Sequence, residues 1–331
     1  MFCKQKYFKQ KRMRTTSKTS IILLILITLF YSCTQPKKNE PVRIGILFGP
    51  SAVSFLHMLD KDSIIDGRKI EISVLKEPMQ IQALMMQGKL EFAILPTLMA
   101  ANLYNKGVKY QMVACPIWGT LYLLANDSTS TLKGLENRSV SLMGQGTTPD
   151  VLLRRVLLQQ GIKSTKFDYT YSTHAEISQA LLMHKTTLAV VSEPMVSNLI
   201  SKDKSIHIVA KLTCEDNEHK IDGDLFVQTA FIVNSTFSTN NKELVKSISS
   251  KYATSCSYCN EQPDSTAKLM LKYKLATDME VAKQSLPLCN IHYVEAASIS
   301  DKVLRFLDIF YQFNPQSLGG KVTDKEFIYQ L

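Results

Sequence analysis

A regular alternation of short apolar runs with helix-like segments, beginning at residue 42, most constrains the fold. The predicted strands are 42–48, 69–75, 92–95 and 110–115, and the helices between them begin at Gly49-Pro50-Ser51, at Glu77-Pro78 and at Pro96-Thr97. Proline suits the first turn of a helix because its missing N–H would have no partner there. Repeated βα units of this length predict an α/β fold with a mainly parallel sheet and helices on both faces.

A helix and strand recur about 97 residues apart. The segment Gln82–Met86 leads to Phe92–Leu95, and Gln179–Met183 leads to Leu188–Val191. A polar loop with a proline follows each strand, which predicts two similar α/β lobes. Short echoes of this kind also arise by chance in α/β proteins.

Two strand-like runs, 119–125 and 226–233, belong to neither repeat and are predicted to be crossovers between the lobes. Lobe 1 is then 42–125 plus 226–331, and lobe 2 is 126–225. The segment Leu212–Asp224 is expected to be a solvated loop.

The turn Gly144–Asp150 lies between an apolar run at 139–142 and a helical pattern at 151–160. We expect Thr148 to cap the helix, with Pro149 at its first position. Two glycines let a ligand approach the backbone closely. The donors expected to hold a small anionic or polar group are the N–H groups of Gly146, Thr147 and Val151 and the hydroxyls of Thr147 and Thr148. An ordinary capped helix is the alternative.

The first 32 residues hold seven Lys and Arg and no acid. The basic residues come first, then the apolar run Ile21–Tyr31, and Ser32-Cys33 follows directly after it. This pattern is typical of a signal peptide (1–32), and the apolar run is shorter than a membrane-spanning helix. A small residue before Cys33 resembles a bacterial lipobox, in which the thiol is acylated. Residues 33–41 would then form a lipid-anchored tether. Plain secretion and an uncleaved anchor are the alternatives.

The basic balance depends largely on this leader. The chain has 39 basic and 29 acidic residues, and removing the seven basic residues of the leader lowers the formal charge from +10 to +3. No basic block with interleaved aromatic residues remains, so we expect no nucleic-acid partner.

Seven cysteines occur in the chain. Cys256-x-x-Cys259 and Cys289-x-x-His292 have spacings that a zinc site could use. Buried thiols or one disulfide are the favoured interpretation, because the first pair falls near the end of a predicted helix. No metal is therefore expected.

Four segments, taken in chain order, resemble the solute-binding proteins of ABC importers. They are the turn 144–150 with Leu152, the pair Glu193-Pro194, the run Pro287–Ile291, and the tail from Phe313-Asn314-Pro315 to Gly319-Gly320. The branch is the nitrate/sulfonate/taurine type, which includes proteins related to synthesis of the thiamine pyrimidine. The likeness covers nearly all of the mature chain.

The resemblance implies a two-lobed periplasmic-binding-protein-like fold (type II) whose two crossover strands act as a hinge. It also implies a monomer outside the cytoplasm, with a small-molecule ligand, an ABC permease and ATPase as partners, and no cofactor. Carried over by position, the ligand contacts are Gly49, Pro50, Ser51, Pro96, Thr97, Trp118, Gly119, Thr120, Gly146, Thr147, Thr148, Glu193 and Gln228.

Several of these residues have a plainer interpretation. Ser51 could cap its helix, and the single tryptophan, Trp118, could belong to the core or its rim. Glu193 could bind a cationic or hydrogen-bond-donating ligand, or it could form a salt link between the lobes. His57, His174 and His184 lie on helical patterns and are expected at the surface or in packing.

The leading hypothesis is a non-catalytic receptor that delivers a small molecule to a permease. No serine nucleophile elbow, zinc-protease motif, phosphate loop or dinucleotide fingerprint occurs in the sequence. The first alternative is an enzyme on the same bilobed fold, of the pyrimidine-precursor or menaquinone-pathway type, and the second is a sensory or adhesive envelope protein with this fold. Backbone donors at helix starts favour an anionic ligand, whereas Glu193 would suit a neutral heterocycle.

Overall fold

A computed structural model of the chain describes residues 40–213 and 226–331. The chain divides into two units, Met1–Glu40 and Pro41–Leu331, and every element below belongs to the second unit. The predicted signal peptide, Cys33, most of the tether and Cys214 lie outside the described residues. Among the described helices, none is both long and apolar enough to cross a membrane.

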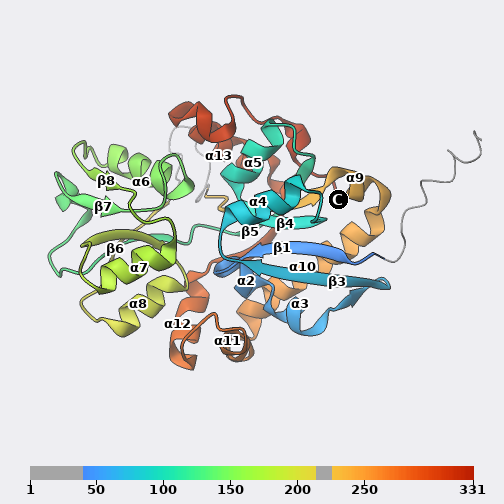
Figure 1. Ribbon diagram of the computed structural model, residues 1–331, viewed down its shortest axis with the longest axis horizontal. Coiled ribbons are helices and arrows are strands. Elements are labelled where there is room, and N and C mark those ends of the chain that lie inside the picture. The colour runs from blue at the N-terminus through green and yellow to red at the C-terminus, as the bar shows by residue number, and fades with distance from the viewer. Residues whose placement is uncertain (1–39, 214–225) are drawn as a thin grey trace, which may run out of the picture. The chain divides into compact units, whose positions relative to one another are not determined.

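Within the described ranges, the first lobe is built on a seven-stranded sheet (Figure 1). In spatial order its strands are β12 (Ile291–Glu295), β5 (Tyr110–Ile117), β11 (Thr229–Asn234), β4 (Phe92–Pro96), β1 (Val42–Leu47), β3 (Arg68–Leu75) and β2 (Ile64–Ile65). The second lobe has a five-stranded sheet. Its order is β10 (His207–Lys211), β6 (Leu121–Ala125), β9 (Leu188–Ser192), β7 (Ser139–Ser141) and β8 (Lys166–Asp168).

Helices cover both faces of the first sheet. One face carries α4 (Pro78–Met86), α5 (Thr97–Asn105) and α13 (Ser300–Phe313), and the other carries α2 (Pro50–Ser54), α3 (Leu56–Lys61), α10 (Lys242–Glu261), α11 (Pro263–Lys272) and α12 (Met279–Leu288). The alternation of side chains along β4 explains this arrangement, since Phe92 and Ile94 pack with the second group and Ala93 and Leu95 with the first.

The second sheet is covered in the same way. Helix α6 (Thr148–Gln159) lies on one face, and α7 (His174–Leu182) and α8 (Met195–Lys202) lie on the other (Figure 1). Val190 of β9 packs with α6, whereas the next residue, Val191, packs with α7 and α8. The shorter elements are α9 (Ser235–Asn240) and the 3₁₀ turns Leu132–Leu135, Ala296–Ile299, Pro315–Leu318 and Lys325–Phe327.

The predicted internal echo has a counterpart in the topology. Strand β4 follows α4 and lies between β11 and β1, whereas β9 follows α7 and lies between β6 and β7. Each of the two strands runs parallel to its neighbour β1 or β7 and antiparallel to its neighbour β11 or β6. The two lobes therefore repeat one arrangement of strands.

Three expectations need correction. The sheets are mixed rather than mainly parallel, because β6 and β11 each enter a sheet from the opposite lobe and run antiparallel to their neighbours. Strand β6, which the sequence analysis assigned to lobe 1, pairs in the second sheet. Among the described residues, the segments that cross between the lobes are therefore 118–120 and 226–228. The single helix expected to begin at Gly49-Pro50-Ser51 is two helices, separated at Phe55.

An aromatic cluster holds the first lobe together. The ring of Phe231 on β11 lies 4.9 Å from that of Tyr252, 5.2 Å from that of Phe92 and 6.2 Å from that of Phe55. These residues come from β11, α10, β4 and the α2–α3 junction, so the cluster joins segments that precede the second lobe in the chain to segments that follow it.

Replacing Phe231 with alanine should lower the free energy of unfolding by about 3–5 kcal/mol, because it opens a cavity among buried rings. Urea denaturation followed by circular dichroism measures this loss. Phe313→Ala is the matched control, since that ring is 41% exposed and its loss should cost less than about 1 kcal/mol. Equal losses in the two variants would contradict the assigned role of the cluster.

Candidate functional site

The loop after β1 meets the loop after β9 where the two lobes face each other. Gly49 has a φ of 112°, a conformation that favours glycine, and it is the N-cap of α2. A Cβ atom at this position would lie 3.5 Å from the backbone oxygen of Glu193 in the other lobe. Pro50 and Ser51 are buried in the first turn of α2. Ser51 is therefore not the helix cap, because that position belongs to Gly49.

Two buried threonines lie at the end of β4. Pro96 precedes α5, and the Thr97 N–H donates to the backbone oxygen of Gln228 at 3.0 Å. The hydroxyl oxygens of Thr97 and Thr229 are buried without a hydrogen-bond partner. Thr229 pairs with Pro96 across β11 and β4, so both threonines belong to the same sheet end. Buried hydroxyls normally have partners, so this pair is suited to contact a polar ligand.

The two crossing segments are joined side by side. The Thr120 N–H donates to Gln228 Oε1 at 2.5 Å, and Gln228 Nε2 donates to the Thr120 hydroxyl at 2.7 Å. The Thr120 hydroxyl also hydrogen-bonds to that of Ser192, at 2.8 Å, at the end of β9. An isolated antiparallel bridge between Trp118 and Val227 extends the pairing. The amide of Gln228 thus links the two crossovers.

Trp118 is fixed mainly by the backbone next to it. Its Nε1 donates to the oxygen of His292 at 2.7 Å, and its N–H donates to the oxygen of Asn290 at 3.1 Å. The Asn290 side chain donates to the Trp118 oxygen. The adjacent Gly119 has a positive φ of 44°. These contacts favour the core-rim interpretation of Trp118 and add Asn290, whose role the sequence analysis missed.

The turn Gly144–Asp150 uses its own donors. The Gly146 N–H donates to Asp150 Oδ2 at 2.8 Å, the Thr147 N–H to the Gly144 oxygen at 3.2 Å, and the Thr147 hydroxyl to the same oxygen at 2.7 Å. The Val151 N–H donates to the Thr147 oxygen at 3.0 Å. The N-cap is Thr147 rather than Thr148, which is the first residue of α6, so Pro149 is the second. A carboxylate of the chain therefore occupies the place expected for an anionic ligand.

A buried polar network anchors this carboxylate. Asp150 Oδ1 accepts from Arg154 Nε at 2.8 Å and from the Tyr169 hydroxyl at 2.7 Å. Arg154 also donates to the Tyr169 hydroxyl at 2.7 Å. Asp150 is 2% exposed, and a buried charge needs a partner. Arg154 of the same lobe supplies the compensating charge. The spacing of Asp150 and Arg154, four residues apart on a helix, was a readable signal for this pair.

Glu193 is buried at the start of α8. Its Oε1 accepts from the Ser197 hydroxyl at 3.0 Å and its Oε2 from the Ser197 N–H at 3.3 Å. Burial raises the pKa of Glu193 to about 7, against the smaller opposing effect of the two Ser197 donors. No cation is paired with Glu193 in the described part of the chain, so the expected alternative of a salt link between the lobes is not found.

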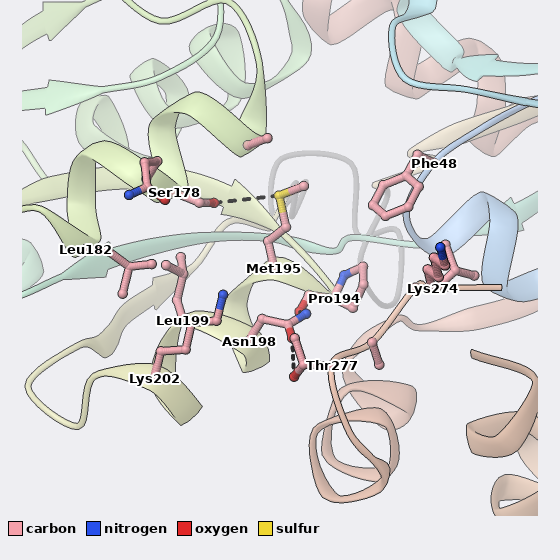
Figure 2. A pocket seen from close by; sticks show the side chains of 14 residues that line it. Phe48, Ser178, Leu182, Pro194, Met195, Asn198, Leu199, Lys202, Lys274 and Thr277 are labelled. Atoms are coloured by element: carbon pink, nitrogen blue, oxygen red, sulfur yellow. Dashed lines mark hydrogen bonds between the residues drawn. The ribbon is translucent and has the colours of Figure 1, made fainter. Parts of the chain in front are cut away.

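A cavity of about 430 Å³ lies beside these loops (Figure 2). Residues of α7 and α8 line one side, and Phe48 and the loop between α11 and α12 line the other. The Thr277 hydroxyl donates to Asn198 Oδ1 at 3.1 Å and so connects the two sides. None of the predicted ligand contacts lines this cavity. Two of its lining residues, Phe48 and Pro194, are next in the sequence to the predicted contacts Gly49 and Glu193.

The cysteines of the described residues do not assemble into a metal site. Within residues 40–213 and 226–331, no three His, Cys, Asp or Glu side chains lie together as metal ligands would. Cys256, Cys259 and Cys289 are buried free thiols, as is Cys115. Burial raises the pKa of Cys259 to about 12, so it remains a thiol at neutral pH. The predicted packing of His57 is observed as a stack on Tyr258, and His184 is exposed.

No protein-family model matches the chain, and no curated protein sequence does. Solved structures do match. An ABC transporter protein from Parabacteroides distasonis is 31% identical, with a TM-score of 0.76 over 88% of this chain and 99% of that chain. The periplasmic aliphatic sulphonate-binding protein SsuA from Escherichia coli is 16% identical, with a TM-score of 0.69 over 88% of this chain and 93% of that chain. The periplasmic nitrate-binding protein NrtA from Synechocystis is 11% identical, with a TM-score of 0.64 over 88% and 87% of the two chains.

These structures confirm the two-lobed α/β fold predicted from the sequence.

The raised pKa of Glu193 predicts a pH dependence of stability. The folded chain binds this proton more tightly than the unfolded chain, whose glutamate has the ordinary pKa of 4.5. The free energy of unfolding should therefore decrease as the pH rises from about 4.5 to about 7, by up to about 3 kcal/mol relative to Glu193→Gln. Urea denaturation across this range measures the difference. The exposed Glu280→Gln should keep the wild-type slope, and a Glu193→Gln slope equal to that of the wild type would contradict the assignment.

Proposed function

We propose that this chain, which belongs to the family of ABC-transporter solute-binding proteins of the nitrate and sulfonate type, captures a small molecule between its two lobes and delivers it to a membrane permease. The solved structures that it resembles include periplasmic binding proteins for aliphatic sulphonates and for nitrate, and the ligand-binding component of an ABC-type import system from Staphylococcus aureus. They give no support to the alternative of an enzyme on the same fold.

The approach of Gly49 to the backbone of Glu193 carries this proposal. The two residues come from different lobes, and Thr120 and Gln228 hydrogen-bond to each other on the two segments that connect these lobes. We propose that the lobes, 42–120 with 226–331 and 121–213, move as bodies about this hinge and close on the solute. Hinges of binding proteins absorb such motion in a few extended residues.

The polar groups of the cleft favour an uncharged solute over an anion. The donors of the turn at Gly146 are already taken by Asp150, and Arg154 is bound to the same carboxylate. The hydroxyls of Thr97 and Thr229, in contrast, are buried and have no hydrogen-bond partner among the described residues. We therefore propose that a neutral, hydrogen-bonding heterocycle contacts these hydroxyls, with Ser51 and the Glu193 loop on either side.

Thr97→Val tests this assignment, because the two expected effects have opposite signs. Removing an unpaired buried hydroxyl should raise the free energy of unfolding of the unliganded protein by about 1 kcal/mol. It should also weaken solute binding about tenfold. A thermal-shift panel of pyrimidines, taurine, alkanesulfonates and nitrate identifies the solute, since a ligand at 100 times its Kd adds about 2.7 kcal/mol.

The exposed Thr236→Val serves as the matched control and should change neither quantity. Stabilisation by nitrate or a sulfonate but by no pyrimidine would overturn the preference for a neutral solute. Unchanged affinity in Thr97→Val would remove this threonine from the site.

We also propose that Cys33 carries the lipid anchor, with 1–32 removed as the signal peptide. The support is the order of basic residues, apolar run and Ser32-Cys33 in the sequence. Cys33→Ser should move the protein from the detergent phase to the aqueous phase in Triton X-114 partitioning, while Cys3→Ser should not. Detergent-phase recovery of Cys33→Ser would contradict the proposal.

A further inference from the structure

The cavity beside α7 and α8 is lined by apolar side chains and by two lysines. Figure 2 shows Phe48 and Lys274 on one side, with Leu182 and Met195 facing them. Leu199 and Leu275 complete the apolar lining. Its volume of about 430 Å³ falls in the range of small-molecule sites, which are mostly apolar with a few placed polar groups.

The charged residues that line the cavity are both lysines, Lys202 and Lys274, and no acid lines it. Neither lysine forms an ion pair with any of the described residues. The nearest acids along the chain are engaged elsewhere. Asp203 accepts from the N–H and hydroxyl of Ser205, and Asp278 accepts from the N–H of Val281. The cavity therefore combines an apolar surface with two exposed lysines that have no acidic partner among the described residues.

Lys274 occupies a backbone position that favours glycine. Its φ is 57°, and it follows the last turn of α11. The Lys274 N–H donates to the Leu271 oxygen at 3.0 Å, and the Leu275 N–H donates to the Met270 oxygen at 2.7 Å. This hydrogen-bond pattern is a helix end at which glycine is usual, because a side chain is strained there. A lysine at this position brings its charge to the cavity at the expense of local stability.

The cavity also spans both lobes. Lys202, Met195 and Asn198 belong to α8, whereas Lys274 and Thr277 belong to the loop between α11 and α12. The hydrogen bond from Thr277 to Asn198 already joins these two elements. A molecule held by both lysines would make a second connection between them.

We propose that this cavity is a second small-molecule site, which binds a small amphiphilic carboxylate. The apolar chain packs against Phe48, Leu182 and Met195, and the carboxylate pairs with Lys202 and Lys274. The site goes beyond the proposed function, because none of its lining residues is a candidate contact of the cleft between the strand-end loops.

Isothermal titration calorimetry with octanoate tests the proposal. Octanoate should bind the purified protein, whereas acetate, which lacks the chain, and octylammonium, which reverses the charge, should bind at least tenfold more weakly. Lys202→Ala should weaken octanoate binding up to about fivefold, as expected for the loss of an ion pair to an exposed lysine. Equal affinities for octanoate and octylammonium would overturn the proposal.

Lys274→Gly separates binding from folding. Glycine relieves the left-handed strain, so the melting temperature of the free protein should rise while octanoate affinity falls about fivefold. The matched control is Lys268→Ala on α11, an exposed lysine outside the cavity, which should leave octanoate affinity unchanged. Unchanged affinity in Lys274→Gly, or an equal loss in Lys268→Ala, would overturn the assignment. Octanoate binding that persists in Thr97→Val distinguishes this site from the proposed solute cleft.

Discussion

The reciprocal hydrogen bonds between Thr120 and Gln228 determine how the two lobes meet. Each side chain lies on one of the two crossing segments, and the Thr120 hydroxyl continues the contact to Ser192 in the second sheet. The same two segments connect the lobes whose loops approach each other at Gly49 and Glu193.

Two buried carboxylates at helix starts illustrate opposite solutions to the cost of burial. Asp150 receives Gly146, Arg154 and Tyr169 as donors, and so completes a helix start without any ligand. Among the described residues, Glu193 receives the two donors of Ser197 alone, and desolvation raises its pKa. The chain thus supplies its own anion at one helix start and leaves a weakly compensated acid at the other.

Much of the fold could be predicted from the sequence because its causes are local. The apolar runs predicted the bounds of β1, β4 and β5 to within two residues. The similarity between Gln82–Met86 and Gln179–Met183 predicted that the strands after these segments occupy equivalent places in the two sheets. The direction of β6 and β11 depended on which lobe each strand enters, which no local pattern encodes. The hydrogen bond from the Gly146 N–H to Asp150 joins residues four positions apart, a spacing that can be read from the sequence. A glycine-rich turn is equally compatible with a bound ligand, so the sequence did not decide between the two. The left-handed backbone of Lys274 had no signal, because lysine is not a residue that marks such a turn.

The position of β11 between β4 and β5 has a consequence for how the chain acquires its structure. Strands β4 and β5 follow each other in the sequence, yet each pairs with β11, whose residues come more than a hundred positions later. The first sheet therefore cannot be completed until the whole second lobe has been synthesised, whereas the second sheet draws on one continuous stretch. Nearby contacts form faster than distant ones, so the second lobe is set to fold ahead of the first. The ring of Phe231, arriving with β11, then brings the early and late parts of the chain into a single core.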